Sequence, residues 1–346
     1  MIKPNRLKPQ DTIAIIAPSW QGNEIFPHVV EKGIERLEKE FKFKIKRGKT
    51  LSQTDQELYE NPKLRADDIH EQFLDKNVKG IITIIGGDES IRVLEHINPE
   101  IIKNNPKFFM GYSDINTFNT YFNQLGLVTF NGPALMAGFA ESKNLEPDFI
   151  EHINNFIFKT WQEFEYKKFN RYTNKYLDWN DKNNLNKENT NYITNNDNWH
   201  FIQGTETING ELFGGCIEIM EMMKGTKYWP ELHFWKNKIL FLETSEEKPS
   251  VIYVELWLRN YGIQGILNQI NGIIFGRARD YSEEEKIQLE KTIIKVLKEF
   301  KRQNLPVITN MDFGHTDPQF ILPLGIKAQI NPKEKSFKLL ESPFKN

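Results

Sequence analysis

The stretch Gly80-Ile81-Ile82-Thr83-Ile84-Ile85-Gly86-Gly87-Asp88-Glu89-Ser90 is an almost continuous apolar run that ends in a diglycine turn and a polar segment. An apolar run without alternation is typical of a strand that is buried on both faces. Residues 12–18 and 107–110 have the same character, and each of the three runs is followed by apolar residues at helical spacing. Buried strands that alternate with helices predict a parallel sheet covered on both faces, and hence an α/β fold.

The length of the chain, 346 residues, favours two domains over one. We predict an N-terminal α/β domain over residues 1–163 and a smaller C-terminal α/β or α+β domain over residues 204–346, where 238–242 and 272–276 have the pattern of buried strands. Residues 164–203 lack a sustained apolar period and are interpreted as an inter-domain loop, which at this length is either functional or disordered. The loop is richer in aromatic residues than a plain linker, with Tyr172, Tyr176, Trp179 and Tyr192.

The composition excludes several classes of partner. Lys plus Arg number 45 against 47 for Asp plus Glu, so the net charge of -2 provides no general attraction for a nucleic acid. The first residues lack the apolar core of a signal peptide, and no later run is long enough to span a bilayer. We therefore expect a cytoplasmic protein with no membrane partner. The single cysteine, Cys216, excludes an internal disulfide and a cysteine-based zinc site.

Ser113 follows the third apolar run in Phe109-Met110-Gly111-Tyr112-Ser113-Asp114-Ile115, directly before a predicted helix. A serine at such a strand-to-helix turn can project its hydroxyl from the carboxyl edge of the sheet, which is a good position for a nucleophile. The alternative is that Ser113 and Asp114 only cap the helix. The stretch differs from the G-x-S-x-G turn of α/β-hydrolases because Ile115 replaces the second glycine.

Backbone amides near Ser113 could stabilise a developing oxyanion. Asp114 provides one candidate amide, and Gly87 in the diglycine turn provides the second, because a chain without a Cβ can approach a ligand closely. Diglycine turns also serve strand-to-helix geometry or bind a phosphate, so these alternatives remain open.

Two further residues have the chemistry of a serine hydrolase. Glu243 ends the apolar run 238–242, and the carboxyl ends of strands are where the sites of open α/β sheets form. His315 lies in a loop of glycine, proline and small polar residues, and a neutral imidazole oriented by a carboxylate can accept the proton of a hydroxyl. The other histidines show no metal-ligand spacing, so we expect no metal and no cofactor.

Four blocks taken together resemble the LD-carboxypeptidase family of serine peptidases. They are 80–90, 109–115, Leu240-Phe241-Leu242-Glu243 and Asp312-Phe313-Gly314-His315-Thr316-Asp317-Pro318. The resemblance implies a flavodoxin-like N-terminal domain, a smaller C-terminal domain and an active site in the cleft between them. It also implies a triad of Ser113, Glu243 and His315 that cleaves an amide bond near a carboxy terminus, and a homodimer.

Within that family the chain is similar to the branch that confers self-immunity to microcin C. The resemblance rests on 84–94, Gly225-Thr226-Lys227-Tyr228-Trp229-Pro230 and the aromatic loop around Tyr176-Leu177-Asp178-Trp179. It implies that Trp179 stacks on the nucleobase of the substrate, although Trp179 could instead anchor the loop to its own domain. Cys216 stands where many relatives have asparagine, and it has the setting of a buried helix residue rather than of a second nucleophile.

Three functions are consistent with these residues. The first is cleavage of an amide-type bond in a peptide-nucleotide or aminoacyl-nucleotide conjugate, and the second is trimming of a murein tetrapeptide by the same triad. The third, of another class, is a catalytically silent module in which Gly86-Gly87 binds a nucleotide phosphate. Asp88 and Glu89 count against the third function because they would repel a phosphate.

Overall fold

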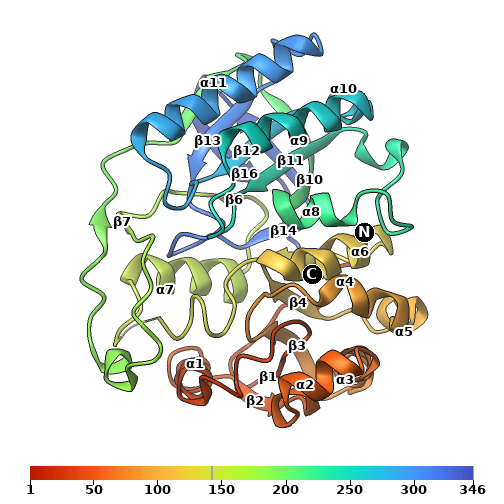
Figure 1. Ribbon diagram of the computed structural model, residues 1–346, viewed down its shortest axis with the longest axis vertical. Helices are drawn as coiled ribbons and strands as arrows, with labels where there is room; N and C mark the ends of the chain where they lie inside the picture. Colours follow the sequence, from red (N-terminus) through yellow and green to blue (C-terminus); the bar gives the residue numbers. More distant parts are fainter. Residues whose placement is uncertain (142, 346) are drawn as a thin grey trace.

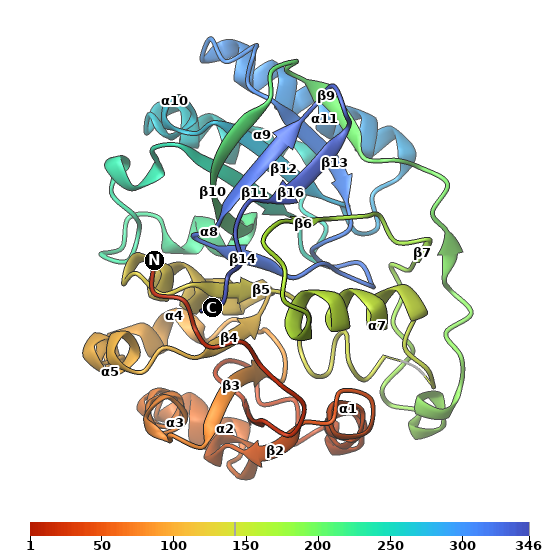
Figure 2. The ribbon, with the colours of Figure 1, turned by 180° about the vertical axis from the view of Figure 1, so that it is seen from behind.

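The computed structural model describes residues 1–141 and 143–345, which form two α/β units stacked on one another (Figures 1 and 2). The first unit is built on a six-stranded sheet with the order β14-β5-β4-β3-β1-β2. Its strands are β1 Thr12–Ile16, β2 Lys44–Arg47, β3 Val78–Thr83, β4 Phe108–Gly111, β5 Thr129–Asn131 and β14 Leu322–Leu324. The first five strands are parallel and have the 2-1-3-4-5 order of flavodoxin-like folds, which confirms the predicted fold class.

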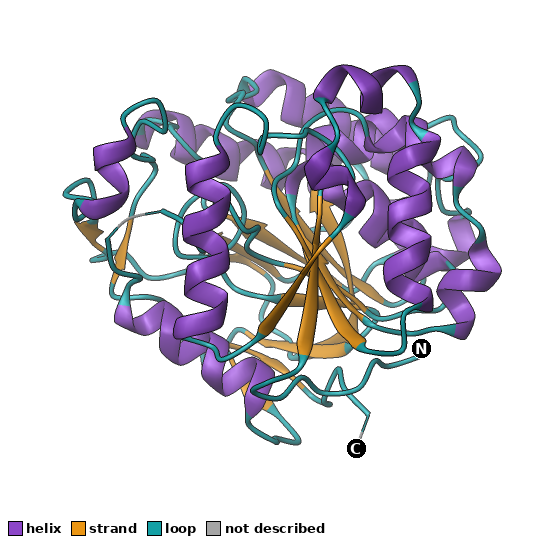
Figure 3. Ribbon diagram, turned by 90° about the horizontal axis from the view of Figure 1, so that it is seen from below, coloured by secondary structure: helices purple, strands orange, loops and turns teal. Residues whose placement is uncertain are grey.

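Helices lie on both sides of the strands, as Figure 3 shows from below. In the first unit they are α1 Pro27–Lys39, α2 Asp55–Glu60, α3 Lys63–Leu74, α4 Ser90–Val93, α5 Pro99–Asn104, α6 Asn116–Gln124 and α7 Pro147–Ile153. The helix predicted after Ser90 is shorter than its spacing indicates. It continues only as a 3-10 turn, Leu94–His96, because Asn98 precedes a proline and such a residue is disfavoured in helical conformation.

The second unit has a mixed sheet of eight strands in the order β6-β16-β15-β10-β11-β12-β13-β9. The four central strands run parallel: β10 Ile208–Cys216, β11 Lys238–Glu243, β12 Gly272–Gly276 and β13 Val307–Met311. Antiparallel strands flank them: β6 Phe164–Glu165, β9 His200–Gln203, β15 Lys327–Asn331 and β16 Ser336–Leu339. Its helices are α8 Ile217–Met223, α9 Val251–Ile263, α10 Ile266–Gln269 and α11 Glu283–Glu299. A second α/β domain was expected, and this unit is one.

The aromatic segment 164–203 is more ordered at its ends than a loop, because β6 pairs with β16 and β9 pairs with β13. Between them, the small sheet of β7 Arg171–Tyr172 and β8 Ile193–Thr194 and a 3-10 turn, Lys182–Asn186, run along one side of the molecule past both units (Figure 2). The segment also touches α1, where His28 Nε2 lies 2.8 Å from the Trp179 carbonyl oxygen.

One apolar core runs through both units. It joins Val30 and Phe130 of the first unit to Phe241 and Ile274 of the second without interruption, whereas a separate cluster fills the space between the first sheet and α3, α5 and α6. The strand β14 strengthens the connection, since it comes from the C-terminal part of the chain and pairs with β5. The two units are therefore held in a defined relative position. Within the described residues, no helix is long and apolar enough to cross a membrane.

Candidate active site

Ser113 lies in the turn between β4 and α6, at the carboxyl edge of the first sheet. Its φ of 60° is in the left-handed region, which a serine adopts only when the surrounding structure enforces it. Neither Ser113 nor Asp114 caps the following helix: the 3-10 turn begins after Tyr112, and no side-chain capping hydrogen bond is made there or at the start of α6. The capping alternative is thus wrong. Backbone strain of the kind found at Ser113 clusters at functional sites.

Ser113 lines a cavity of about 490 Å³ that receives residues from both units and from the aromatic segment. The cavity lies beyond the carboxyl ends of β3 and β4, where ligand sites of open parallel sheets occur. Its lining residues are Trp20, Ile85, Gly86, Gly87, Asp88, Tyr112, Ser113, Ala137, Tyr176, Trp179, Glu246, Glu247, Arg279 and His315.

Glu243 and His315 form a buried pair behind this cavity. Glu243 is the last residue of β11 and is fully buried, and His315, in the loop after β13, is only 3% exposed. Their contact joins His315 Nδ1 to Glu243 Oε2 at 2.7 Å. Gly314 makes the contact possible, because a Cβ at this position would lie 2.7 Å from Glu243 Oε2. A carboxylate at Nδ1 orients the imidazole and leaves Nε2 for the cavity.

The Nε2 atom of His315 is directed at Glu246 rather than at Ser113. The Nε2–Oε2 distance to Glu246 is 3.0 Å, and no hydrogen bond between Ser113 and His315 is found in the described part of the chain. Burial alone would lower the pKa of His315, but the carboxylates of Glu243 and Glu246 outweigh it and raise that pKa to about 10. The ion-pair contact with His315 lowers the pKa of Glu246 to about 2. The two carboxylates therefore favour the charged form of His315, and Glu246 rather than Ser113 faces its Nε2 atom.

The two turns that carry the predicted oxyanion amides are packed on one another. A Cβ on Gly86 would lie 3.0 Å from Ser113 Oγ and 3.3 Å from the Asp114 amide nitrogen. Gly87 has a φ of 138° and leaves no room for a side chain, because a Cβ there would lie 2.7 Å from the Trp20 nitrogen. The glycines thus bring the diglycine turn against the backbone of Ser113 and Asp114, and Gly87 and Ser113 both line the cavity.

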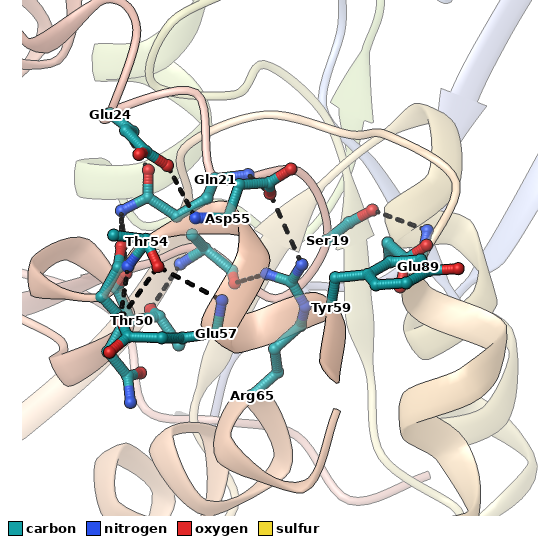
Figure 4. Close-up of polar contacts among 12 residues, drawn as sticks. Ser19, Gln21, Glu24, Thr50, Thr54, Asp55, Glu57, Tyr59, Arg65 and Glu89 are labelled. Carbon is teal, nitrogen blue, oxygen red and sulfur yellow. Dashed lines mark hydrogen bonds and ion pairs between the residues drawn. The ribbon is translucent and has the colours of Figure 1, made fainter. Parts of the chain in front are cut away.

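Hydrogen bonds fix this arrangement. The Ser19 hydroxyl donates to Asp114 Oδ2 at 2.6 Å, and the Ser90 amide donates to the same oxygen at 2.9 Å. Ser19 also accepts from the Glu89 amide at 3.2 Å, a contact drawn in Figure 4 beside the polar network around Arg65. The buried side chain of Asp114 therefore ties the diglycine turn to the turn of Ser113.

Trp179 both faces the cavity and anchors its own segment. Its ring lines the cavity and is partly buried. It packs edge-on against Phe26 with ring centroids 5.5 Å apart and stacks near-parallel to Tyr176 at 6.3 Å. The anchoring interpretation and the ligand-facing interpretation of Trp179 are thus compatible.

Further contacts tie the aromatic segment to the loop of His315. Thr173 and Asp317 exchange two backbone hydrogen bonds, of 2.7 and 3.0 Å, two residues from His315. Trp199 Nε1 donates to Asp312 Oδ2 at 2.9 Å, and Arg277 holds the other oxygen of Asp312 at 2.7 Å. The segment and the histidine loop are therefore one structural unit.

Sequence reasoning missed Glu246, Arg279, Tyr112 and Tyr176 as cavity residues. Arg279 could have been found by the argument that identified Glu243, because it lies three residues beyond the end of β12 at the same edge of the sheet. Glu246 carried the same positional signal, since it lies three residues beyond the end of β11, but Glu247 stands beside it in the same exposed turn and nothing in the sequence distinguished the two.

Cys216 is buried at the end of β10, opposite Glu243 in the parallel register. Its amide donates to Asn116 Oδ1 at 2.9 Å, which joins the second unit to the start of α6. Burial, with Glu243 and Glu218 nearby, raises the pKa of the thiol well above its usual range. A protonated thiol is a poor nucleophile, so Cys216 has a structural role. Among the residues that the structure describes, no group of three or more His, Cys, Asp or Glu side chains could hold a metal ion.

A flavodoxin-like unit and a second α/β unit that share one cavity define the chain as a two-domain α/β enzyme. Family comparison agrees over most of the length, since residues 13–132 match the LD-carboxypeptidase N-terminal domain and residues 209–330 match the LD-carboxypeptidase C-terminal domain. The chain belongs to the LD-carboxypeptidase family and is a serine peptidase of the carboxypeptidase type. A catalytically silent nucleotide-binding module is therefore excluded as its class.

Individual relatives align with nearly the whole chain. A probable murein peptide carboxypeptidase of Bacillus subtilis is 28% identical over 96% of this chain and 93% of its own length. The microcin C7 self-immunity protein MccF of Escherichia coli is 25% identical over 96% of this chain and 93% of its own. The solved structure of MccF in complex with aspartyl sulfamoyl adenosine superposes with a TM-score of 0.87 and 25% identity, covering all of both chains.

Proposed function

We propose that this protein is a serine carboxypeptidase or amidase that cleaves an amide-type bond in a peptide-nucleotide or aminoacyl-nucleotide conjugate. The nucleophile is Ser113, the base is His315 and the orienting acid is Glu243. The observation that carries the proposal is that Ser113 and His315 line the same cavity, while Glu243 holds the far nitrogen of His315 at 2.7 Å.

The chemistry follows from these positions. Once Glu246 leaves Nε2, the pKa of His315 falls and the imidazolium releases its Nε2 proton to water. The neutral imidazole then accepts the proton of Ser113 Oγ as this oxygen bonds to the substrate carbonyl. The amides of Gly87 and Asp114 stabilise the oxyanion. His315 then protonates the leaving amine as the C–N bond breaks, and a water molecule hydrolyses the acyl-serine ester and restores the hydroxyl of Ser113.

The nucleotide part of the proposal rests on the aromatic wall of the cavity. Trp179 and Tyr176 place two near-parallel rings there, and an indole is a suitable platform for a nucleobase. The complex of MccF with aspartyl sulfamoyl adenosine supports this substrate class. The second candidate is a murein tetrapeptide, which the Bacillus subtilis relative supports.

We also propose that the protein is a cytoplasmic homodimer. On α9, Ile252, Leu256 and Ile263 follow helical spacing, and each is at least 48% exposed. The packed helix α11 also carries two exposed isoleucines, Ile287 and Ile294, and the proposed interface is the exposed apolar face of α9. A surface of this kind is typical of a subunit interface.

The function is tested by incubating the protein with an aminoacyl sulfamoyl adenosine and with a murein tetrapeptide and measuring the products by mass spectrometry. We expect cleavage of the nucleotide conjugate at its amide and none by Ser113→Ala. Cleavage of the tetrapeptide alone would move the assignment to cell-wall recycling. Cleavage of either substrate by Ser113→Ala at the normal rate would disprove the proposed nucleophile.

A further inference from the structure

Arg279 introduces a charge into the cavity that the proposed mechanism does not use. Among the described residues that line the cavity, it is the only one with a permanent positive charge, and it shares the wall with Asp88, Glu246 and Glu247. Its side chain is 13% exposed, so the guanidinium is largely removed from bulk water.

The guanidinium is positioned but not satisfied. It lies over the ring of Tyr176, 4.5 Å from the centroid, which fixes its plane. Its single ion pair within the described residues joins Nε to Asp280 Oδ2 at 3.4 Å, and Nε itself is buried without a hydrogen bond. A guanidinium carries five N–H donors in a fork that matches an oxyanion, and a buried donor without a partner, such as Nε here, is costly.

Glu246 shows that the cavity accepts an oxyanion beside the reacting groups. Its carboxylate lies 3.0 Å from His315 Nε2, and its attraction to Arg279 is felt by both side chains. It is also 54% exposed and lies in a turn, so a ligand can displace it. The Glu246 carboxylate therefore marks a position in the cavity where a carboxylate oxygen meets His315.

We propose that Arg279 is a specificity-determining residue that binds an oxyanion of the substrate, and that this oxyanion displaces Glu246. The oxyanion is either the carboxylate of the terminal residue or the anionic linker of a nucleotide conjugate, because both present oxygens that the fork can hold. The inference rests on the proposed function, since it assigns a substrate contact in the same cavity.

A structural role is the competing account. Glu141 and Asp317 are buried carboxylates whose charges interact with Arg279, although neither makes an ion pair with it within 4.0 Å. If Arg279 only balanced these charges, its replacement would weaken every ligand to a similar extent and lower the thermal stability. Matched charged and neutral ligands separate the two accounts.

The experiment measures binding by calorimetry in the Ser113→Ala background, so it does not depend on turnover. The ligands are a murein tetrapeptide and its carboxy-terminal amide, and an aminoacyl sulfamoyl adenosine and an uncharged aminoacyl-amino-deoxyadenosine. We expect Arg279→Gln to weaken the charged member of one pair by about 10- to 100-fold and its neutral partner by less than about 3-fold. Arg279→Lys, which keeps the charge but loses the fork, should lie between.

The ligand pair whose charged member loses affinity in Arg279→Gln identifies which part of the substrate provides the oxyanion. Equal losses for both members of each pair, or no preference of the parent protein for either charged ligand, would overturn the proposal. Thermal unfolding of Arg279→Gln and Arg279→Lys shows whether both fold, and the lysine variant suffices if the glutamine variant does not. Failure of the proposed function is a separate result, seen as unchanged hydrolysis by Ser113→Ala.

Discussion

At the scale of single residues, the protonation state of His315 decides whether it can act as the proposed base. The imidazole lies between Glu243 at Nδ1 and Glu246 at Nε2, and both carboxylates favour its charged form. A charged imidazole cannot accept the proton of Ser113. Glu246, a residue outside the proposed triad, thus favours the charged form of His315 and opposes its proposed role as a base.

Replacing Glu246 should change the pH dependence of catalysis. The kcat/KM of the parent enzyme should rise as the pH approaches 10, because the pKa of His315 is raised to about 10 and kcat/KM reports the free enzyme. In Glu246→Gln the rise should move to lower pH, since one of the two stabilising carboxylates is gone. Glu247→Gln is the control, because Glu247 lines the cavity without an ion pair to His315 in the described structure. An identical profile for Glu246→Gln and the parent would contradict this account.

The same pair should leave a signature in stability. The raised pKa of His315 contributes stability that is complete below its ordinary value of 6.5 and is lost as the pH rises through about 10. The lowered pKa of Glu246 contributes stability that is present above 4.5 and is lost as the pH falls through about 2. The difference in melting temperature between the parent and Glu246→Gln should therefore be greatest between pH 4.5 and 6.5. Thermal unfolding across the pH range measures it, and a pH-independent difference would show that the ion pair is not responsible.

The proposed triad makes its own prediction. Ser113→Ala and His315→Ala should each reduce kcat by about 10³-fold or more, because triad members act as a unit and lose most of their effect together. Ser113 lies in a turn held by Asp114 and the glycines, so Ser113→Ala should retain the native circular dichroism spectrum. A double variant that is much less active than either single variant would show that the two residues act independently.

At the scale of elements, the segment 164–203 connects the cavity wall at Trp179 to the loop of His315. Backbone pairing of Thr173 with Asp317 and the bond from Trp199 to Asp312 attach it on either side of His315, while Trp179 packs on Phe26 of the first unit. The segment therefore spans the cavity between two attachment points. Its aromatic residues serve both attachment and the lining of the cavity.

Trp179→Ala should weaken binding of an aminoacyl sulfamoyl adenosine by about 1–3 kcal/mol and hardly change cleavage of a murein peptide, which has no base. Trp179→Phe keeps an aromatic face and should lose less. Because Trp179 also packs on Phe26 and Tyr176, thermal unfolding must accompany the binding measurement. Equal losses on both substrates, with a lowered melting temperature, would assign Trp179 to anchoring alone.

At the scale of the whole molecule, the site depends on how the two units meet. Ser113 comes from the first unit, and Glu243 and His315 come from the second. A common core and strand β14 keep the two units in a fixed relative position. The domain boundaries at residues 163 and 204 remain a prediction. Strand β14 lies beyond residue 204 but returns to the first sheet, where it pairs with β5.

The exposed apolar face of α9 is the interface of the proposed dimer. Leu256→Glu should convert this proposed dimer into a monomer in size-exclusion chromatography with light scattering, because a charge would be buried beside Ile252 and Ile263. Leu74→Glu is the matched control, as Leu74 is a leucine of similar exposure on α3 of the first unit. A monomeric parent protein, or a dimer that survives Leu256→Glu, would exclude this surface as the interface.

The sequence by itself determined the α/β class and the family. Strands such as β1, β4, β11 and β12 could be predicted because a run buried on both faces needs apolar residues at every position. Ser113, Glu243 and His315 could be selected as candidates because they follow such runs or lie in family blocks. The antiparallel edge strands were not predicted, since short strands such as β6 in the second sheet and β14 in the first have too few residues to show a period.

Only the tertiary structure decided which charges meet. Glu246 faces His315 across 69 residues of sequence, and Arg279 lies over Tyr176 across 103, so no local pattern could pair them. The local sequence determines whether a residue sits in a strand, a helix or a turn, because those depend on neighbours along the chain. The protonation of His315 and the unfilled donors of Arg279 depend on distance and burial in the folded molecule, and these exist only once the two units have packed together.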